Sequence, residues 1–186
     1  MQKVFYIKNM VCDRCKSKIT QIVHENHAEI KDLQLGKISI LPQPQFDEEK
    51  FSNQLTQEGF ELIKNPDLQT VESIKTHLLK IINTASYPEN LSEFLAKKLY
   101  KDYSVLSKLF KKNAGETLEK YFIKLKIEKV KELIQMQKFT FSEIAHQLNY
   151  NNISHLSSQF KNTTGMTMSA YQNQRNWDRS SLDKII

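Results

Sequence analysis

The chain has 186 residues, of which 39% are hydrophobic and 26% are charged, as in ordinary globular proteins. It has no apolar run of about 18 residues, which argues against a membrane-spanning helix, and its charged beginning is unlike a signal peptide. The two cysteines stand three positions apart, which excludes a disulfide scaffold and favours a reducing, cytoplasmic location.

The charge is unevenly distributed along the chain. Residues 1–68 carry 9 Lys and Arg against 10 Asp and Glu, a net charge of −1. Residues 69–186 carry 18 against 11, a net charge of +7. This asymmetry predicts a neutral first domain and a second domain that meets a polyanion.

Residues 1–64 predict a domain with the order strand, helix, strand, strand, helix, strand. Alternating apolar residues around Gly36 indicate a hairpin, and acidic residues after Phe46 suit the first turn of a helix. This order is that of a ferredoxin-like α+β domain. The elements are expected at residues 4–7, 16–26, 33–35 and 37–40, from 46 to 58, and at 60–63.

A Met-x-Cys-x-x-Cys motif, in which Cys12 and Cys15 are the thiols, lies between the first strand and the first helix. Cys15 is expected at the helix N-terminus, where the helix dipole favours a thiolate. Two thiolates suit a soft ion such as Cu(I). A tetrahedral zinc site needs two more ligands, and the nearest candidates, His24 and His27, are expected at the far end of the helix.

Residues 1–64 resemble the heavy-metal-associated domain of copper chaperones and copper ATPases, which implies that Cys12 and Cys15 hold a soft metal ion. Asn9 stands where that family usually has Gly, and Asp13 and Arg14 are larger and more charged than its usual inter-cysteine pair. A thiol redox switch and a metal-free relic of the fold are the alternatives for this motif.

Turn-forming residues around Pro66 predict a linker at residues 65–70, followed by an all-α domain at 71–175 and a tail at 176–186. Apolar residues at helical spacing indicate a helix that opens at Thr70. Further helices are expected from Asn90, at 103–113, at 118–137, from a cap at Ser142 to 148, at 152–163, and from Met168.

An internal repeat lies in this helical half. The segment from Gly115 to Tyr121 is matched 50 residues later by the segment from Gly165 to Tyr171, and the match continues upstream. A repeated unit of helix, turn and helix with a polar and basic surface is typical of two helix-turn-helix readers of DNA.

Residues 70–175 resemble the AraC/XylS family of transcription regulators, both in the pattern from Ile144 to Tyr171 and in that from Leu95 to Lys111. The resemblance implies seven helices, two recognition helices in successive major grooves, and duplex DNA and RNA polymerase as partners. The sequence departs from the family at four positions: Ser158 replaces a common Arg, Met168 a common Pro, and Tyr100 and Asn149 the usual turn Gly.

The exposed faces of the two recognition helices supply candidate contacts to DNA. Base-edge candidates are Tyr103, Ser104 and Lys108 in the first helix, and Asn152, Ser154, His155, Ser158 and Gln159 in the second. Phosphate candidates are Lys111, Lys112 and Lys161. Neither helix contains an arginine, and Asn and Gln pair with adenine, so we expect an A·T-rich operator.

The sequence therefore predicts a DNA-binding transcription regulator that responds to a soft metal ion such as Cu(I). Two alternatives stay open: the first domain is a metal-free interaction or dimerisation module, or the chain is a cytoplasmic metal carrier. No clustered carboxylates, catalytic triad or phosphate-binding glycine loop point to an enzyme. Oligomeric state and the sign of regulation are open.

Overall fold

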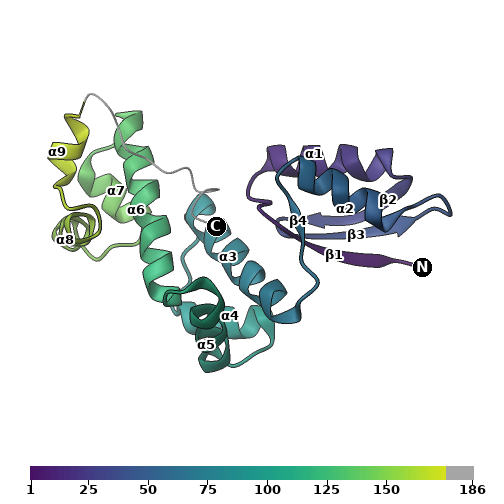
Figure 1. The fold of residues 1–186 in the computed structure, drawn as a ribbon. Helices are drawn as coiled ribbons and strands as arrows, with labels where there is room; N and C mark the ends of the chain where they lie inside the picture. Colours follow the sequence, from purple (N-terminus) through teal and green to yellow (C-terminus); the bar gives the residue numbers. More distant parts are fainter. Residues whose placement is uncertain (175–186) are drawn as a thin grey trace. The chain divides into compact units, whose positions relative to one another are not determined.

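The computed structural model describes residues 1–174, which form two compact units, Met1–Thr76 and a second that begins at His77 (Figure 1). The predicted tail at 176–186 lies outside the described residues, as does residue 175. Within residues 1–174, no helix is both long and apolar enough to cross a membrane.

The first unit contains the expected order of strands and helices. Its sheet has the strand order β2-β3-β1-β4, and every neighbouring pair is antiparallel. Helices α1 and α2 lie on one face of this sheet (Figure 1). The elements are β1 (Lys3–Lys8), α1 (Asp13–Glu25), β2 (Ala28–Gln34), β3 (Lys37–Pro42), α2 (Glu48–Gln57) and β4 (Glu61–Leu62).

Local chemistry explains these boundaries. Gly36 has φ +75° in the β2–β3 turn, a conformation that glycine adopts without strain. The side chain of Asp47 caps α2 by accepting hydrogen bonds from the backbone N–H groups of Glu49 and Lys50. Helix α1 begins at Asp13, three residues earlier than expected, because the extended backbone of Cys12 forms its N-cap.

Seven helices follow within the described chain, and the first begins earlier than expected. Asn65 Oδ1 accepts hydrogen bonds from the N–H groups of Asp67 and Leu68, and Pro66 lacks the N–H that a first helical residue leaves unpaired. Helix therefore occupies most of the predicted linker. The helices are α3 (Pro66–Thr84), α4 (Leu91–Leu99), α5 (Tyr103–Ala114), α6 (Leu118–Met136), α7 (Phe141–Gln147), α8 (Ile153–Thr164) and α9 (Met168–Gln172).

The sequence repeat is a structural repeat. Helices α5 and α8 each have 12 residues and end at a glycine with positive φ, 76° at Gly115 and 80° at Gly165. One turn before each glycine, a buried phenylalanine packs on a tyrosine of the following helix. The ring centroids are 5.2 Å apart for Phe110 and Tyr121 and 5.7 Å apart for Phe160 and Tyr171.

The predicted cap of α7 at Ser142 is wrong, because Thr140 occupies that position. Its hydroxyl accepts a hydrogen bond from the N–H of Glu143, whose carboxylate in turn accepts one from the N–H of Thr140. This reciprocal pair satisfies two backbone donors and starts the helix two residues earlier than the Ser142 cap would.

Candidate nucleic-acid interface and thiol pair

Helix α5, the first recognition helix, presents most of its candidate residues to solvent. Ser104, Lys108, Lys111 and Lys112 are all exposed. Tyr103 is only half-exposed, and its hydroxyl donates a 2.5 Å hydrogen bond to Glu119 Oε1 in α6. The hydroxyl of Tyr103 therefore anchors α5 to α6.

Helix α8, the second recognition helix, also presents a polar face. Ser154, His155, Ser158 and Lys161 are exposed. Asn152, expected to contact a base, is the N-cap of this helix, and its Oδ1 accepts a 2.8 Å hydrogen bond from the N–H of His155. Its side-chain oxygen is thus part of the helix start.

Gln159 is held from behind by Tyr150. Tyr150, 8% exposed, donates a 2.7 Å hydrogen bond from its hydroxyl to Gln159 Oε1. Its ring also meets His155 edge-on, with centroids 5.4 Å apart. Burial, and after it the neighbouring Tyr87, raises the pKa of Tyr150, so this hydroxyl keeps its proton. One buried tyrosine therefore contacts two of the predicted base readers.

Lys126 of α6 lies among three aromatic rings. Its Nζ is 4.5 Å from the ring centroid of Tyr150, 4.8 Å from that of Tyr87 and 5.5 Å from that of Phe122. Burial lowers the pKa of Lys126 to about 8, whereas the electron-rich ring faces favour its charged form. The cage ties α6 to the turn that precedes α8.

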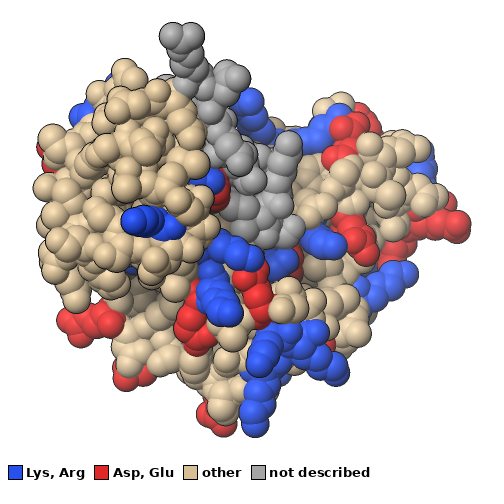
Figure 2. All heavy atoms as spheres, turned by 60° about the vertical axis from the view of Figure 1, so that its left-hand side comes forward, with Lys and Arg blue, Asp and Glu red and all other residues tan. Residues whose placement is uncertain are grey.

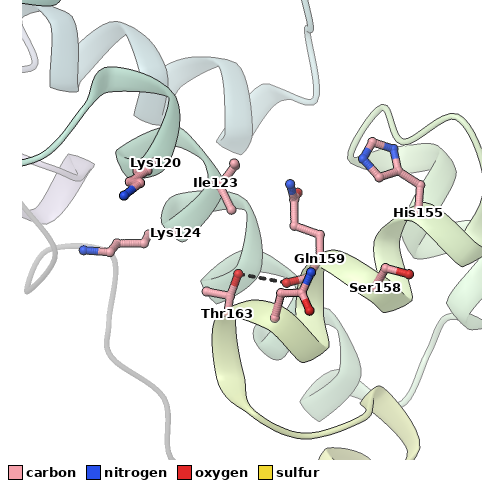
Figure 3. A pocket seen from close by; sticks show the side chains of 8 residues that line it. Lys120, Ile123, Lys124, His155, Ser158, Gln159 and Thr163 are labelled. Atoms are coloured by element: carbon pink, nitrogen blue, oxygen red, sulfur yellow. Dashed lines mark hydrogen bonds between the residues drawn. The ribbon is translucent and has the colours of Figure 1, made fainter.

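The residues of α8 face a hollow that α6 closes on its other side (Figure 3). This hollow has a volume of about 450 Å³. Lys120, Ile123 and Lys124 line it from α6, opposite His155, Ser158, Gln159, Asn162 and Thr163 of α8. The sequence interpretation treated α6 as a spacer and missed these two lysines, although their four-residue spacing places them on one helix face.

Positive charge is concentrated around the first helix-turn-helix. Residues 91–117 contain six lysines, whereas residues 139–174 contain one, Lys161. Figure 2 shows a large, nearly uncharged tan area on one part of the surface, with blue and red side chains intermingled below and beside it. The first helix-turn-helix copy thus offers ammonium groups, and the second copy offers mainly amide, hydroxyl and imidazole groups.

One equivalent residue in each turn between the paired helices has the same backbone φ angle. Tyr100 and Asn149, which stand where the resemblance implies glycine, both have φ 53°. Asparagine tolerates this left-handed conformation, whereas tyrosine does so at a cost of about 1 kcal/mol. The first turn therefore keeps the repeat's geometry and carries strain.

The two thiols meet at the start of α1. The Sγ atoms of Cys12 and Cys15 are 3.3 Å apart, with Cys12 exposed and Cys15 partly buried. Asn9 has φ 68° and donates from its side-chain amide to the carbonyl oxygen of Gly59, 2.8 Å away. This explains why asparagine can occupy a position that favours glycine.

Cys15 differs from the sequence expectation in its protonation. Burial raises its pKa above the ordinary thiol value, although backbone hydrogen bonds at Val11 and Cys12 act in the opposite direction. The Cys15 thiol lies 3.8 Å from the carbonyl oxygen of Asn9, an acceptor that favours the protonated form. The helix N-terminus therefore does not by itself yield a thiolate here.

The donors available to a metal ion at this place are the two sulfurs. His24 lies in the last turn of α1 and His27 follows that helix, as expected, so both are at the end opposite the thiols. Within residues 1–174, no group of three or more His, Cys, Asp and Glu side chains converges on one point.

Comparisons with known proteins agree with the structure of the helical half. A family model described as "Helix-turn-helix domain" matches residues 95–174. No curated protein sequence matches the chain.

Three solved structures are similar to this chain. The C-terminal domain of AraT, a response regulator from Geobacillus stearothermophilus, is 21% identical with a TM-score of 0.52, over 63% of this chain and 92% of that one. A DNA-binding transcriptional dual regulator from Escherichia coli K-12 is 22% identical with a TM-score of 0.47, over 53% and 88%. The regulator CdpR from Pseudomonas aeruginosa is 15% identical with a TM-score of 0.46, over 76% and 46%. On the family match and the repeated geometry, residues 95–174 form a helix-turn-helix domain.

Proposed function

We propose that the protein is a transcription regulator that binds duplex DNA through α5 and α8. The observation that carries this proposal is the repeat: two helices with matching buried faces each present a polar surface from a helix-turn-helix. Such a helix enters the major groove, and two of them on one chain can occupy successive grooves. RNA polymerase is the further partner that a transcription regulator needs.

The two helix-turn-helix copies have different roles in this proposal. The lysines of the first helix-turn-helix copy, with Lys120 and Lys124 beside α8, neutralise phosphates and supply affinity that does not depend on sequence. His155, Ser158 and Gln159 approach base edges. Because neither recognition helix has an arginine, guanine contacts by bidentate arginine are excluded, and the operator as a whole is A·T-rich.

Salt dependence of DNA binding tests this proposal. Fluorescence anisotropy of a labelled duplex with the full chain should give log affinity that falls with log salt by about 0.9 per phosphate contact. Lys161→Ala should weaken binding to all sequences alike and reduce the slope by about one contact. Lys50→Ala, an exposed lysine of α2, is the control and should change neither quantity. Absence of binding at low salt would refute the proposal.

A second proposal concerns the N-terminal unit, Met1–Thr76, which carries the thiol pair. Its strand order, β2-β3-β1-β4, supports the expected ferredoxin-like domain. Cys12 and Cys15 fit a soft ion such as Cu(I), since two sulfurs 3.3 Å apart at an accessible helix start are its preferred donors. Because burial raises the pKa of the Cys15 thiol, metal binding should release protons.

Competition with a Cu(I) chelator under anaerobic conditions tests metal binding. The full chain should take up one Cu(I), and Cys12→Ser should abolish tight uptake because one thiolate remains. His24→Ala, at the opposite end of α1, is the control and should compete like the natural sequence. Equal competition by the Cys12→Ser protein would favour the metal-free interaction module.

Metal responsiveness requires that the two activities are coupled. A useful switch needs about 1–3 kcal/mol of coupling, a change in operator affinity of about 5- to 150-fold. Operator affinity should therefore differ with and without one equivalent of Cu(I), and Cys15→Ser should remove the difference. If the natural sequence and Cys15→Ser have the same operator affinity with and without Cu(I), the N-terminal unit, Met1–Thr76, is a passive or partner-binding module.

A further inference from the structure

We infer that Tyr150 is a specificity-determining residue of the second recognition helix, because it fixes which end of the Gln159 amide is presented to DNA. The inference rests on the proposed DNA binding and goes beyond it by assigning a role to a buried residue that does not itself reach a base. Tyr150 acts through Gln159 and is a positioning residue.

The geometry of Tyr150 leaves its ring little freedom. The ring is 8% exposed and packs between Lys126 Nζ, 4.5 Å from its centroid, and the imidazole of His155, 5.4 Å away. A tyrosine held on two sides aims its hydroxyl in one direction. That direction is Gln159 Oε1, at 2.7 Å. Gln159 is therefore preorganised before any ligand arrives.

The hydrogen bond decides the chemistry of the Gln159 side chain. The tyrosine hydroxyl keeps its proton and donates it, so the amide oxygen turns toward Tyr150 and the two N–H donors of Nε2 are left for a ligand. Figure 3 shows the amide end of Gln159 directed into the space between Ile123 and His155. An unrestrained glutamine would instead offer both a donor and an acceptor, the pattern that matches adenine.

Two donors match a base edge with two acceptors. In the major groove that edge belongs to guanine, whose N7 and O6 both accept. Gln159 should thus read one G·C pair within an operator that is otherwise A·T-rich. The first helix-turn-helix copy has no equivalent hydrogen bond, because Lys101 and Leu109 occupy the positions that correspond to Tyr150 and Gln159.

Selection of bound duplexes from a random pool, followed by affinity measurements on single-base variants, tests this inference with the full chain. The natural sequence should prefer guanine at one position by roughly tenfold, and Gln159→Ala should lose that preference. Tyr150→Phe, which removes only the hydroxyl, should reduce it by at least about twofold and admit adenine, while affinity for the rest of the operator stays the same. In the Gln159→Ala background, Tyr150→Phe should have no further effect on base preference.

Tyr171→Phe is the matched control, since it keeps the ring and removes only a hydroxyl that accepts a hydrogen bond from a glutamine of α6, Gln135 Nε2 at 2.8 Å. This variant should keep the guanine preference, and thermal melting should show that all variants fold. An unchanged preference in Tyr150→Phe, or an equal change in the Gln159→Ala background, would overturn the inference and leave DNA binding intact. Failure of the natural sequence to bind any duplex would overturn the inference together with the proposed function.

Discussion

The two helix-turn-helix copies differ at one pair of equivalent positions. The first copy has Lys101 in the turn between α4 and α5 and Leu109 in α5, and the second has Tyr150 in the turn before α8 and Gln159 in α8. Both pairs stand on the same scaffold of helix, turn, helix and terminal glycine. In the first copy the pair contributes an exposed ammonium group and a partly buried leucine. In the second copy it forms a hydrogen bond from a buried tyrosine to a glutamine amide.

This difference distinguishes the positions that stabilise the helix-turn-helix fold from those that determine its binding properties. The buried positions recur in both copies because each must fill the same space between three helices. The exposed positions are free of that constraint and have diverged, to six lysines in residues 91–117 and one in residues 139–174. Affinity and sequence preference can thus reside in different copies of one fold.

The largest expected effect tests whether the two scaffolds are equivalent. Phe110 and Phe160 are both fully buried and pack on Tyr121 and Tyr171 respectively. Phe110→Ala and Phe160→Ala should each lower the free energy of unfolding of the helical unit by about 3–5 kcal/mol, measured by urea denaturation. Losses that differ by more than about 2 kcal/mol would show that the copies are not equivalent.

The repeated residues explain what the sequence could predict. The spacing of Leu106 and Phe110, repeated in Leu156 and Phe160, follows from the 3.6-residue helical period, so the helices and their pairing could be predicted. The Met-x-Cys-x-x-Cys motif likewise placed the thiols at a helix start. In both cases the signal lies in neighbouring residues.

Other contacts depend on residues that are distant in sequence. Tyr150 and Lys126 come into contact only when α6 packs against the second helix-turn-helix copy. The hydrogen bond from Tyr103 to Glu119 likewise joins α5 to α6. Burial of Cys15 in the fold also raises its pKa, which opposes the thiolate that local reasoning had favoured. Helical periodicity identifies which positions of a helix are exposed. It does not identify a side chain from a distant segment that contacts those positions.

The second largest effect concerns the Lys126 ammonium group of α6, which packs against Tyr150 of the second helix-turn-helix copy. Lysine loses its proton near pH 10.4 in an unfolded chain and near pH 8 at Lys126, where burial lowers the pKa to about 8. Between these pH values the unfolded chain binds more protons, so stability rises with pH. From pH 7.5 to 9.5, the free energy of unfolding should rise by about 1 kcal/mol relative to Lys126→Met, a value reduced for the residual exposure of Lys126.

Urea denaturation across this pH range measures the difference between the two proteins. Lys120→Met changes an exposed lysine of the same helix and should retain the rise. If the free energy of unfolding of Lys126→Met rises by the same amount, other groups cause the rise, and the Lys126 ammonium does not distinguish the two helix-turn-helix copies.

A smaller effect distinguishes the starts of the two recognition helices. The side chain of Asn152 caps α8, whereas that of Asp102 makes no capping hydrogen bond at the start of α5. Asn152→Ala should therefore lower the free energy of unfolding by about 1 kcal/mol, and Asp102→Ala should change it by less than about 0.5 kcal/mol. Equal losses would mean that Asp102 caps its helix in solution.

The smallest effect concerns Tyr100 and Asn149, which have the same φ angle in the two turns but are different residue types. Tyr100 has φ 53° and is 93% exposed, so its ring makes few contacts that could offset the strain of the left-handed region. Asn149 has the same φ, and asparagine adopts it readily.

Tyr100→Gly should therefore raise the free energy of unfolding by about 0.5–1 kcal/mol, since relief of strain exceeds the extra entropy that glycine gives the unfolded chain. Asn149→Gly should change it by only a few tenths of a kcal/mol. Thermal melting of both variants measures the contrast. If Tyr100→Gly instead destabilises the unit, the exposed ring must contribute to its stability, and the strain assigned to the first turn would be too small to matter. If it stabilises the unit but weakens DNA binding, the strain persists because the tyrosine contacts the duplex beside α5.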